Sequence, residues 1–450
     1  MGTISLISEQ DIAMEESLPL ISPRNPTPTE TFFLSNIDQT VAFHVETVFF
    51  FDGIPVGKTS EMDIVERVKA AVSVDLLVPY YFMAGRLKLN GEGNRLELVC
   101  NNAGVQFCSA TSRLRLKELG NLSHPNPSFC HLVLKMDKSN NIMEVPLLTI
   151  QVTKFKCGGF SIGFVANHGV LDGRSAAEMF QNLASICRGE GLKTQVLNND
   201  RTCIRARVPP QIKYPHEEYT KLPEMTTSFT CPSNLSPPPS LLGLPHNQSY
   251  QLFHFTAQMI TALKNKATVK CSSFEALVAH LWQSRSRAVF QDLSATSSVL
   301  FAVDIRNKMS PPLPHGFVGN AVVTACASAR MVDLKEQPLR FCVQRVKESI
   351  ENLSDEYVRS VVDWLEVHRG VPCTSNGNFY VSAWWKLPFH ELDFGYGRPI
   401  YGGPVVKADT DEFVLLLSDG ARGGKGEGVN VWISLDQEKM KKFMLHVFDF

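Results

Sequence analysis

Residues 160–173, with the sequence FSIGFVANHGVLDG, constrain the fold of this chain more than any other stretch. Every second residue from Phe160 onward is hydrophobic, and His168 continues the same alternation. A period of two predicts a β-strand with one packed face. Gly169 and Gly173 then predict a tight turn, because glycine permits backbone conformations and close approaches that other residues resist.

A helix is expected directly after this turn, since hydrophobic residues recur at helical spacing at Ala176, Met179, Phe180 and Leu183. The strand therefore delivers the imidazole of His168 into a turn that another segment or a ligand can approach closely. The four-residue offset to Asp172 fits a histidine whose surroundings are held by a carboxylate. Asp172 can instead point away from His168, toward a cation such as Arg306.

Two reactive residues compete in this stretch. Flanking glycines and a nearby carboxylate favour His168 as a general base, although a histidine beside a packed strand is often structural. Residues 159–163, GFSIG, match the G-x-S-x-G pattern of serine hydrolases, with Ser161 as the nucleophile. That pattern requires the strand to end at the serine, whereas the alternation continues through Ser161. The sequence therefore favours His168.

The composition indicates an ordinary globular protein of 450 residues, long enough for two or three domains. A net charge of -1 gives no electrostatic reason to expect nucleic acid or an anionic membrane as a partner. No apolar run approaches the length of a membrane span, and the N-terminus lacks a signal-peptide profile. The 11 cysteines form no C-x-x-C pair, which favours reduced thiols in a cytoplasmic protein over a metal site.

Strand and helix patterns alternate in two long segments, residues 1–190 and residues 250–450, with large antiparallel components in both. Residues 191–249 are rich in proline and turn formers, and we expect a linker or crossover loop there. The sequence thus predicts an α/β (α+β) protein of two domains. The segment near residues 372–395 is the part of the second half that can pack against the first domain.

Two signatures resemble those of the plant BAHD acyltransferases. Residues 168–173, HGVLDG, match the H-x-x-x-D-G motif of that family, and residues 393–397, DFGYG, are similar to its D-F-G-W-G motif. Supporting stretches are YFMAGR at 81–86, VDIR at 303–306 and PLPHGFVGN at 312–320. The resemblance covers almost the whole chain.

The resemblance implies two chloramphenicol-acetyltransferase-like domains, each a mixed β-sheet flanked by helices, with a channel between them. Members transfer an acyl group from coenzyme A to an alcohol or amine, without a metal or a tightly bound cofactor. Acyl-CoA is the co-substrate, His168 would be the general base, and Asp172 would pair with Arg306. A cytoplasmic monomer of plant specialised metabolism is implied, with acyl-CoA and a small acceptor as its partners.

The family's second signature suggests structural and substrate-binding roles for further residues. The Asp393 loop, with Gly395 and Gly397, would lie far from the base and be structural. In hydroxycinnamoyl members a tryptophan on the preceding strand helps hold the acceptor and the tetrahedral oxygen. Trp384 matches it, and Ser382 stands where those members often have threonine. From the residues alone, Trp384 fits either a core or an apolar channel wall.

Two departures from the family pattern bear on the substrate. Tyr396 replaces the usual tryptophan of the second signature, which packing should tolerate. Residues 375–378, SNGN, offer no cation where shikimate-accepting members carry arginine, so shikimate or quinate is not the expected acceptor. Residues 34–39, LSNIDQ, look more like the branch that acylates long-chain alcohols, ω-hydroxy acids or amines, often with hydroxycinnamoyl groups. A non-catalytic relative that acts by binding is the remaining alternative, against which the intact His168 argues.

Overall fold

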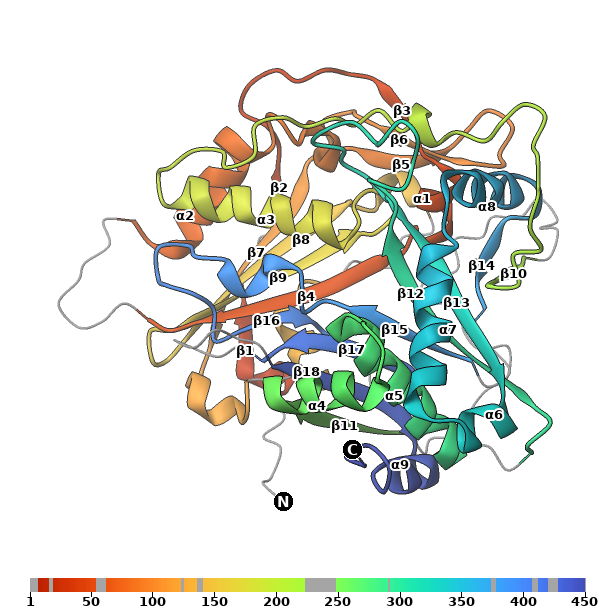
Figure 1. Ribbon diagram of the computed structural model, residues 1–450. Helices are drawn as coiled ribbons and strands as arrows, with labels where there is room; N and C mark the ends of the chain where they lie inside the picture. The colour runs from red at the N-terminus through yellow and green to blue at the C-terminus, as the bar shows by residue number, and fades with distance from the viewer. Residues whose placement is uncertain are drawn as a thin grey trace.

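The computed structural model describes residues 7–15, 19–53, 62–122, 125–135, 141–222, 248–289, 292–373, 378–406, 412–419 and 428–449. Two large β-sheets, one in each half of the chain, lie side by side with helices packed against them (Figure 1). Both sheets mix parallel and antiparallel neighbours. The predicted α/β architecture, with a mixed sheet in each half, is confirmed.

The first sheet has the order β1-β7-β8-β9-β4-β16, and β2 also pairs with β7. Its strands are β1 (Ile12–Met14), β2 (Leu20–Ile21), β4 (His44–Phe51), β7 (Val105–Ser112), β8 (Leu148–Phe155), β9 (Phe160–Asn167) and β16 (Tyr401–Pro404). Strand β9 is the predicted strand before His168, and it forms an antiparallel hairpin with β8. Every residue of β9 is buried, because helices and loops cover both faces of the sheet.

Helices α2 (Ile64–Ala71) and α3 (Gly173–Cys187) cover one face of this sheet. The alternating residues of β9 point into that layer, where the rings of Phe164 and Phe180 stack with centroids 4.1 Å apart. Helix α3 is the helix expected after the turn. Packing of this kind fixes where β9 ends, and therefore where His168 lies.

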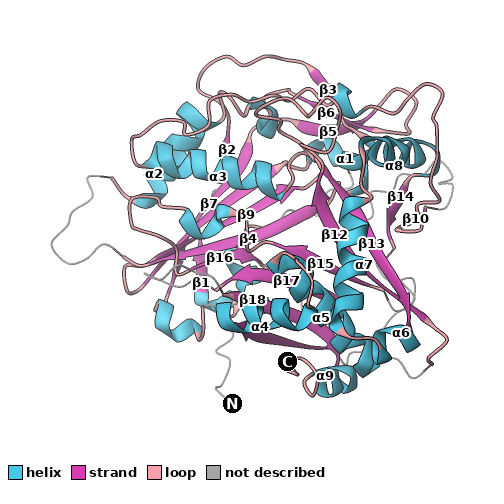
Figure 2. Cartoon of the chain, viewed as in Figure 1, coloured by secondary structure: helices cyan, strands magenta, loops and turns pink. Residues whose placement is uncertain are grey.

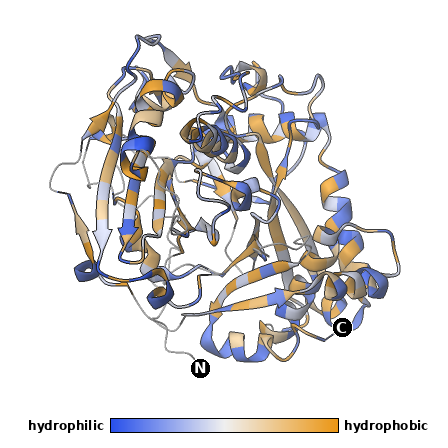
Figure 3. Cartoon of the chain, turned by 90° about the vertical axis from the view of Figure 1, so that its left-hand side faces the viewer, coloured by the Kyte–Doolittle hydropathy of each residue, from blue (hydrophilic) through white to orange (hydrophobic). Residues whose placement is uncertain are grey.

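The second sheet has the order β11-β18-β17-β15-β12-β13. Its strands are β11 (Gln248–Phe255), β12 (Thr296–Asp304), β13 (Val322–Arg330), β15 (Phe379–Ala383), β17 (Phe413–Ser418) and β18 (Val429–Asp436). The helices of this half are α4 (Ala257–Ala267), α5 (Ser273–Val289), α6 (Met331–Glu336), α7 (Leu339–Glu351), α8 (Asp355–His368) and α9 (Gln437–Phe443). Figure 2 shows these helices beside the strands, and Figure 3 shows hydrophobic residues concentrated along the strands.

The short elements complete the described chain. A small sheet consists of β3 (Thr31–Phe33), β5 (Arg86–Leu89) and β6 (Leu96–Val99), and β10 (Tyr219–Lys221) pairs with β14 (Gly370–Pro372). Helix α1 (Asn36–Thr40) follows β3. Short 3₁₀ or π turns are η1 (Glu9–Asp11), η2 (Val72–Leu76), η3 (Tyr81–Ala84), η4 (Leu116–Leu119), η5 (Pro127–Leu132), η6 (Ile142–Glu144), η7 (Thr202–Ile204) and η8 (Pro388–Glu391).

The last strand of the first sheet comes from the second half of the chain. Strand β16 pairs antiparallel with β4, and the ring of Phe389 in η8 lies 5.6 Å from that of Phe49. Sequence patterns did not reveal β16, because its sequence, YGGP, contains few residues that favour strands. The close packing requires glycine at position 402, because a Cβ there would lie 2.4 Å from the ring of Phe49.

The crossover between the halves is fastened to α8 over its described part. Arg207 Nε donates to Asp363 Oδ2 at 2.6 Å. The buried ring of His216 lies 2.8 Å from Ser360 Oγ and 2.9 Å from Glu218 Oε1. These contacts fix the crossover on the second half of the chain. Residues 223–247 of the expected linker lie outside the described residues.

Replacement of Gly163 by alanine should destabilise the protein. A Cβ there would lie 2.1 Å from the carbonyl oxygen of Leu132, which is backbone and cannot rotate away. We expect the free energy of unfolding to fall by about 1–3 kcal/mol, the usual cost of overpacking a core. Urea unfolding of Gly163→Ala measures this. Gly91→Ala is the matched control, because nothing lies within 4 Å of a Cβ at Gly91.

Candidate active site

His168 is the first residue after β9, at the start of the turn that leads to α3. Its backbone N–H donates to the carbonyl oxygen of Phe43 at 2.7 Å, and Gly169 N donates to Asn167 Oδ1 at 2.9 Å. The imidazole lies beside the ring of Phe43, with centroids 5.5 Å apart. The residue as a whole is partly exposed.

The environment of His168 favours the neutral imidazole. Burial lowers its pKa below the ordinary value of 6.5, against the opposing pull of Asp172, Asn320 and Asp38. Its Nδ1 atom is buried and has no hydrogen-bond partner among the residues that the structure describes. A neutral imidazole with part of its surface open can accept a proton from a bound molecule.

Asp172 caps the N-terminus of α3 and points away from His168. Its Oδ1 accepts a hydrogen bond from Ser175 N at 2.8 Å, which satisfies one of the free amides at the helix start. The same carboxylate binds Arg306 with both oxygens, at 3.1 Å to Oδ1 and 2.9 Å to Oδ2. Of the two possibilities left open by the sequence, the cation contact is the one formed.

This ion pair joins the two halves of the chain. Arg306 lies just after β12, and Ala321 N, just before β13, donates to Asp172 Oδ2 at 3.1 Å. Asp172 is only 2% exposed. Burial alone would raise its pKa, but Arg306 and the backbone donors outweigh burial and hold the pKa below the usual range. The carboxylate is therefore ionised, and it serves as a fixed anchor of the turn.

Three further residues hold the turn, and the sequence analysis missed them. Asn320 Nδ2 donates to the carbonyl oxygen of His168 and to Asp38 Oδ1, both at 2.7 Å. Arg201 Nη2 donates to the carbonyl oxygen of Val170 at 2.9 Å, and its Nε lies 3.2 Å from Asp38 Oδ2. Asp38 and Asn320 belong to stretches that supported the family resemblance, but no local pattern links segments so far apart.

Ser161 does not have the geometry of a hydrolase nucleophile. It lies inside β9, opposite Phe50 and Thr153, and no helix begins after it. Its hydroxyl is buried and has no hydrogen-bond partner within the described part of the chain. The serine-hydrolase alternative is therefore set aside.

Ser382 and Trp384 lie next to each other at the end of β15. Trp384 Nε1 donates to Ser382 Oγ at 3.0 Å, and both side chains are partly buried. The chain then bends toward the turn between β9 and α3. A Cβ at Gly173 would lie 2.9 Å from the side chain of Leu387. This segment therefore lies against the start of α3.

The Asp393 loop lies at the opposite end of β9 from His168. Asp393 Oδ1 accepts hydrogen bonds from the amides of Gly395 and Gly397, at 2.7 and 2.9 Å, and both glycines have positive φ. The ring of Tyr396 packs on that of Phe160, with centroids 4.8 Å apart. A strand advances about 3.3 Å per residue, so Phe160 and His168 are roughly 26 Å apart. The loop closes the core without approaching the imidazole.

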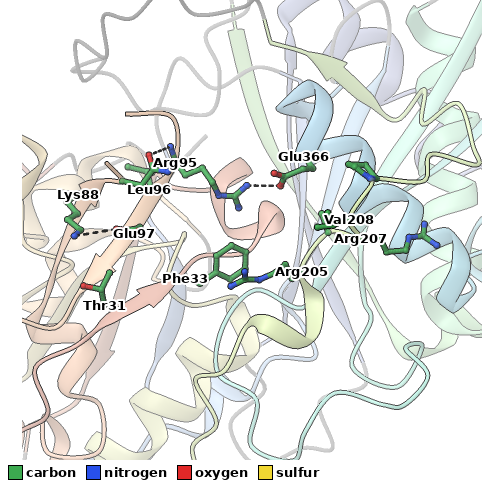
Figure 4. Close-up of a pocket in the computed structure, with 13 residues that line it drawn as sticks. Thr31, Phe33, Lys88, Arg95, Leu96, Glu97, Arg205, Arg207, Val208 and Glu366 are labelled. Carbon is green, nitrogen blue, oxygen red and sulfur yellow. Dashed lines mark hydrogen bonds and ion pairs between the residues drawn. The ribbon is translucent and has the colours of Figure 1, made fainter. Parts of the chain in front are cut away.

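A separate pocket of about 660 Å³ lies between the small sheet, the crossover and α8 (Figure 4). Arg95 Nη1 lies 2.7 Å from Glu366 Oε2 across it. The guanidinium of Arg205 lies 4.3 Å from the ring centre of Phe33. None of the residues that the sequence marked as catalytic lines this pocket.

Three negative findings hold for the described part of the chain. No group of three histidine, cysteine or acidic side chains there could hold a metal ion. No helix among those residues is long and apolar enough to cross a membrane. Their cysteines are free thiols.

Comparison with known proteins identifies the family. The model of the Transferase family matches residues 15–449. The chain belongs to this family, the BAHD acyltransferases. It is therefore an acyl-CoA-dependent acyltransferase, and the alternative of a non-catalytic binding protein is set aside.

The relatives of this BAHD enzyme match over nine tenths or more of their length. Acyltransferase GLAUCE of Arabidopsis thaliana is 35% identical, over 99% of this chain and 97% of that protein. Omega-hydroxypalmitate O-feruloyl transferase of the same plant is 34% identical, over 94% of this chain and 90% of that protein.

Solved structures show the same fold. Vinorine synthase superposes with a TM-score of 0.73 at 22% identity, covering 96% of each chain. TRI101 of F. sporotrichioides, solved with coenzyme A and T-2, gives a TM-score of 0.71 at 18% identity, covering 92% of this chain and 97% of that one.

The substitution Asp172→Asn should weaken the fold of this BAHD enzyme at neutral pH. It leaves the charge of a largely buried arginine without its main partner, and breaking such a pair costs about 3 kcal/mol. Because the folded-state pKa of Asp172 lies below its ordinary value of 3.8, the wild type loses this stability only as the pH falls through that lower value. Urea unfolding at neutral and strongly acidic pH measures the difference, which should shrink in acid. An equal difference at both pH values would contradict the assignment.

Proposed function

We propose that this enzyme transfers a hydroxycinnamoyl or another aromatic or aliphatic acyl group from acyl-CoA to a hydroxyl or amine acceptor, with His168 as the general base. The observation that carries the proposal is the state of His168. Its imidazole is favoured in the neutral form, the residue is partly exposed, and the turn that carries it is fixed from several sides. A base in that state is ready for proton transfer near neutral pH.

The chemical steps follow from a neutral imidazole. His168 accepts the proton of the acceptor hydroxyl or amine as its oxygen or nitrogen attacks the thioester carbonyl carbon. The resulting tetrahedral intermediate collapses with cleavage of the carbon–sulfur bond, and the imidazolium returns the proton to the thiolate of coenzyme A. Because a thiolate is a good leaving group, no covalent enzyme intermediate is needed. Both substrates must then be bound together.

Ser382 is our candidate donor to the oxyanion of the tetrahedral intermediate. Trp384 Nε1 already donates to Ser382 Oγ, which leaves the hydroxyl hydrogen of Ser382 free to point at a substrate oxygen. A preorganised donor of this kind stabilises the charge that develops on the carbonyl oxygen. Trp384 would then orient the serine.

For the acceptor, we propose a long-chain alcohol, an ω-hydroxy acid or an amine, and not shikimate or quinate. Support comes from relatives whose names state such substrates, an omega-hydroxypalmitate O-feruloyl transferase and a fatty alcohol:caffeoyl-CoA acyltransferase that is 32% identical. Residues 375–377, which lack the arginine of shikimate-accepting members, lie outside the described residues.

We further propose a cytoplasmic, monomeric enzyme with an N-terminal domain over residues 1–190 and a C-terminal domain over residues 250–450. The channel between them would bring acyl-CoA and acceptor to His168. Support for the division comes from the two separate sheets, each with its own hydrophobic core. Reduced cysteines among the described residues agree with a cytoplasmic location.

Replacement of His168 by alanine should abolish acyl transfer, by about 10²–10⁴-fold or more, the usual contribution of general-base catalysis. Release of free coenzyme A from acyl-CoA, with a panel of fatty alcohols, ω-hydroxy acids and amines, measures the rate. Ser161→Ala is the control and should keep most of the activity. Ping-pong kinetics, or an active His168→Ala variant, would overturn the proposal.

The acidic limb of the pH profile should lie at unusually low pH for a histidine. Burial lowers the pKa of His168, so the neutral base persists below the ordinary value of 6.5 and activity is lost only at lower pH. The pH dependence of kcat/KM reports this ionisation in the free enzyme. A limb at or above the ordinary value would contradict it.

A further inference from the structure

A single buried carboxylate, that of Asp38, holds the first part of the turn that carries His168 at two points. Through Asp38 Oδ1 it holds the side chain of Asn320, which donates to the carbonyl oxygen of His168. Through Oδ2 it holds Arg201, which donates to the carbonyl oxygen of Val170. The side chains of Asn320 and Arg201 therefore hold the backbone on either side of Gly169.

The geometry of the Asn320 amide depends on this carboxylate. Both hydrogens of Nδ2 are used, one on Asp38 and one on His168. An ionised carboxylate only accepts hydrogen bonds, so Asp38 selects the amide orientation that presents Nδ2. The backbone N–H of Asn320 also donates to Asp38 Oδ1, at 3.1 Å. Flipping the amide would put its oxygen against the carboxylate and release the His168 carbonyl.

The carboxylate is itself held in place and buried. Asp38 is fully buried, as are the side chains of Arg201 and Asn320. Ser35 donates to Asp38 Oδ2 from its backbone N–H and from its hydroxyl, each at 2.8 Å, so the start of α1 is locked to the same group. In the low dielectric of the protein interior such buried hydrogen bonds and ion pairs are strong, so they hold the groups that they contact in a defined arrangement.

We propose that Asp38 is a positioning residue for acyl transfer, which acts through Asn320 and Arg201 to set where the imidazole of His168 lies. This inference rests on the proposed function, because it requires His168 to be the group that takes the proton. The side chain of Asp38 contacts Ser35, Asn320 and Arg201, so it would act on the imidazole only through the turn. It works as Asp172 does from the other end of the turn, so that two carboxylates hold the loop between them.

Asp38→Asn should lower kcat while leaving the KM of both substrates near the wild-type value. The expected fall is about 10²-fold, because a misplacement of roughly 1 Å at a reacting group costs that much. Steady-state kinetics with acyl-CoA and an accepted alcohol measures both constants. Asn320→Ala should also lower kcat and leave KM near the wild-type value. Because this variant keeps the ion pair of Asp38 with Arg201, it tests the inference even if Asp38→Asn does not fold.

Asp363→Asn is the matched control. Asp363 is also fully buried and also receives an arginine, Arg207, but it makes no bond to the turn at His168. It follows Val362, whose carbonyl oxygen accepts from Asn36 of α1, so general loosening near α1 affects the control as well. The control should lose stability in urea and keep its kcat. A kcat for Asp38→Asn and Asn320→Ala no lower than that of the control overturns the inference.

A double variant separates this inference from the proposed function. In the His168→Ala background, Asp38→Asn should cause no further loss of the residual rate, because its target is gone. An additional loss of the same size in that background would mean that Asp38 acts elsewhere. If His168→Ala alone stays active, the proposed function is wrong, independently of the result for Asp38→Asn.

Discussion

The ion pair between Asp172 and Arg306 is the contact on which the site depends. It joins a helix start in the first half of the chain to the end of a strand in the second, at 2.9 Å and almost without solvent. A charge buried without its partner is strongly unfavourable, so the two halves are held in one relative position at this point. The turn between β9 and α3 is therefore held in place as well, and His168 is its first residue.

The same arrangement explains how acidic groups can surround a base without keeping it protonated. Asp172 faces Arg306 and Asp38 faces Arg201, so each negative charge is met by an arginine and not by the imidazole. Desolvation then dominates at His168, and the pKa moves down despite the nearby carboxylates. In the mechanism that we propose, the fold thus separates two tasks that a catalytic dyad would combine, because the carboxylates hold the backbone while the imidazole would take the proton.

Local patterns in the sequence predicted the parts of this structure that depend on local periodicity. The alternation from Phe160 gave β9, and the helical spacing after Asp172 gave α3. The family resemblance suggested the partnership of Asp172 with Arg306. The contacts through which Asp38 holds the turn could not be predicted. They join side chains from α1, the crossover and the segment before β13, which are far apart in the sequence. Strand β16 was missed for a different reason, since a glycine-rich edge segment becomes a strand only when β4 offers it a partner.

Strand β16 has a consequence for biosynthesis. The first sheet is assembled largely from strands of the first half of the chain, yet the strand that covers the outer edge of β4 is made long after β4 itself. Until then the outer edge of β4, with its run of three phenylalanines, presents unpaired amide and carbonyl groups to solvent. Exposed hydrophobic edges recruit other strands, so the nascent chain is vulnerable to self-association for most of its translation. Chaperones that shield β-edges would therefore matter more for this protein than its compact final form suggests.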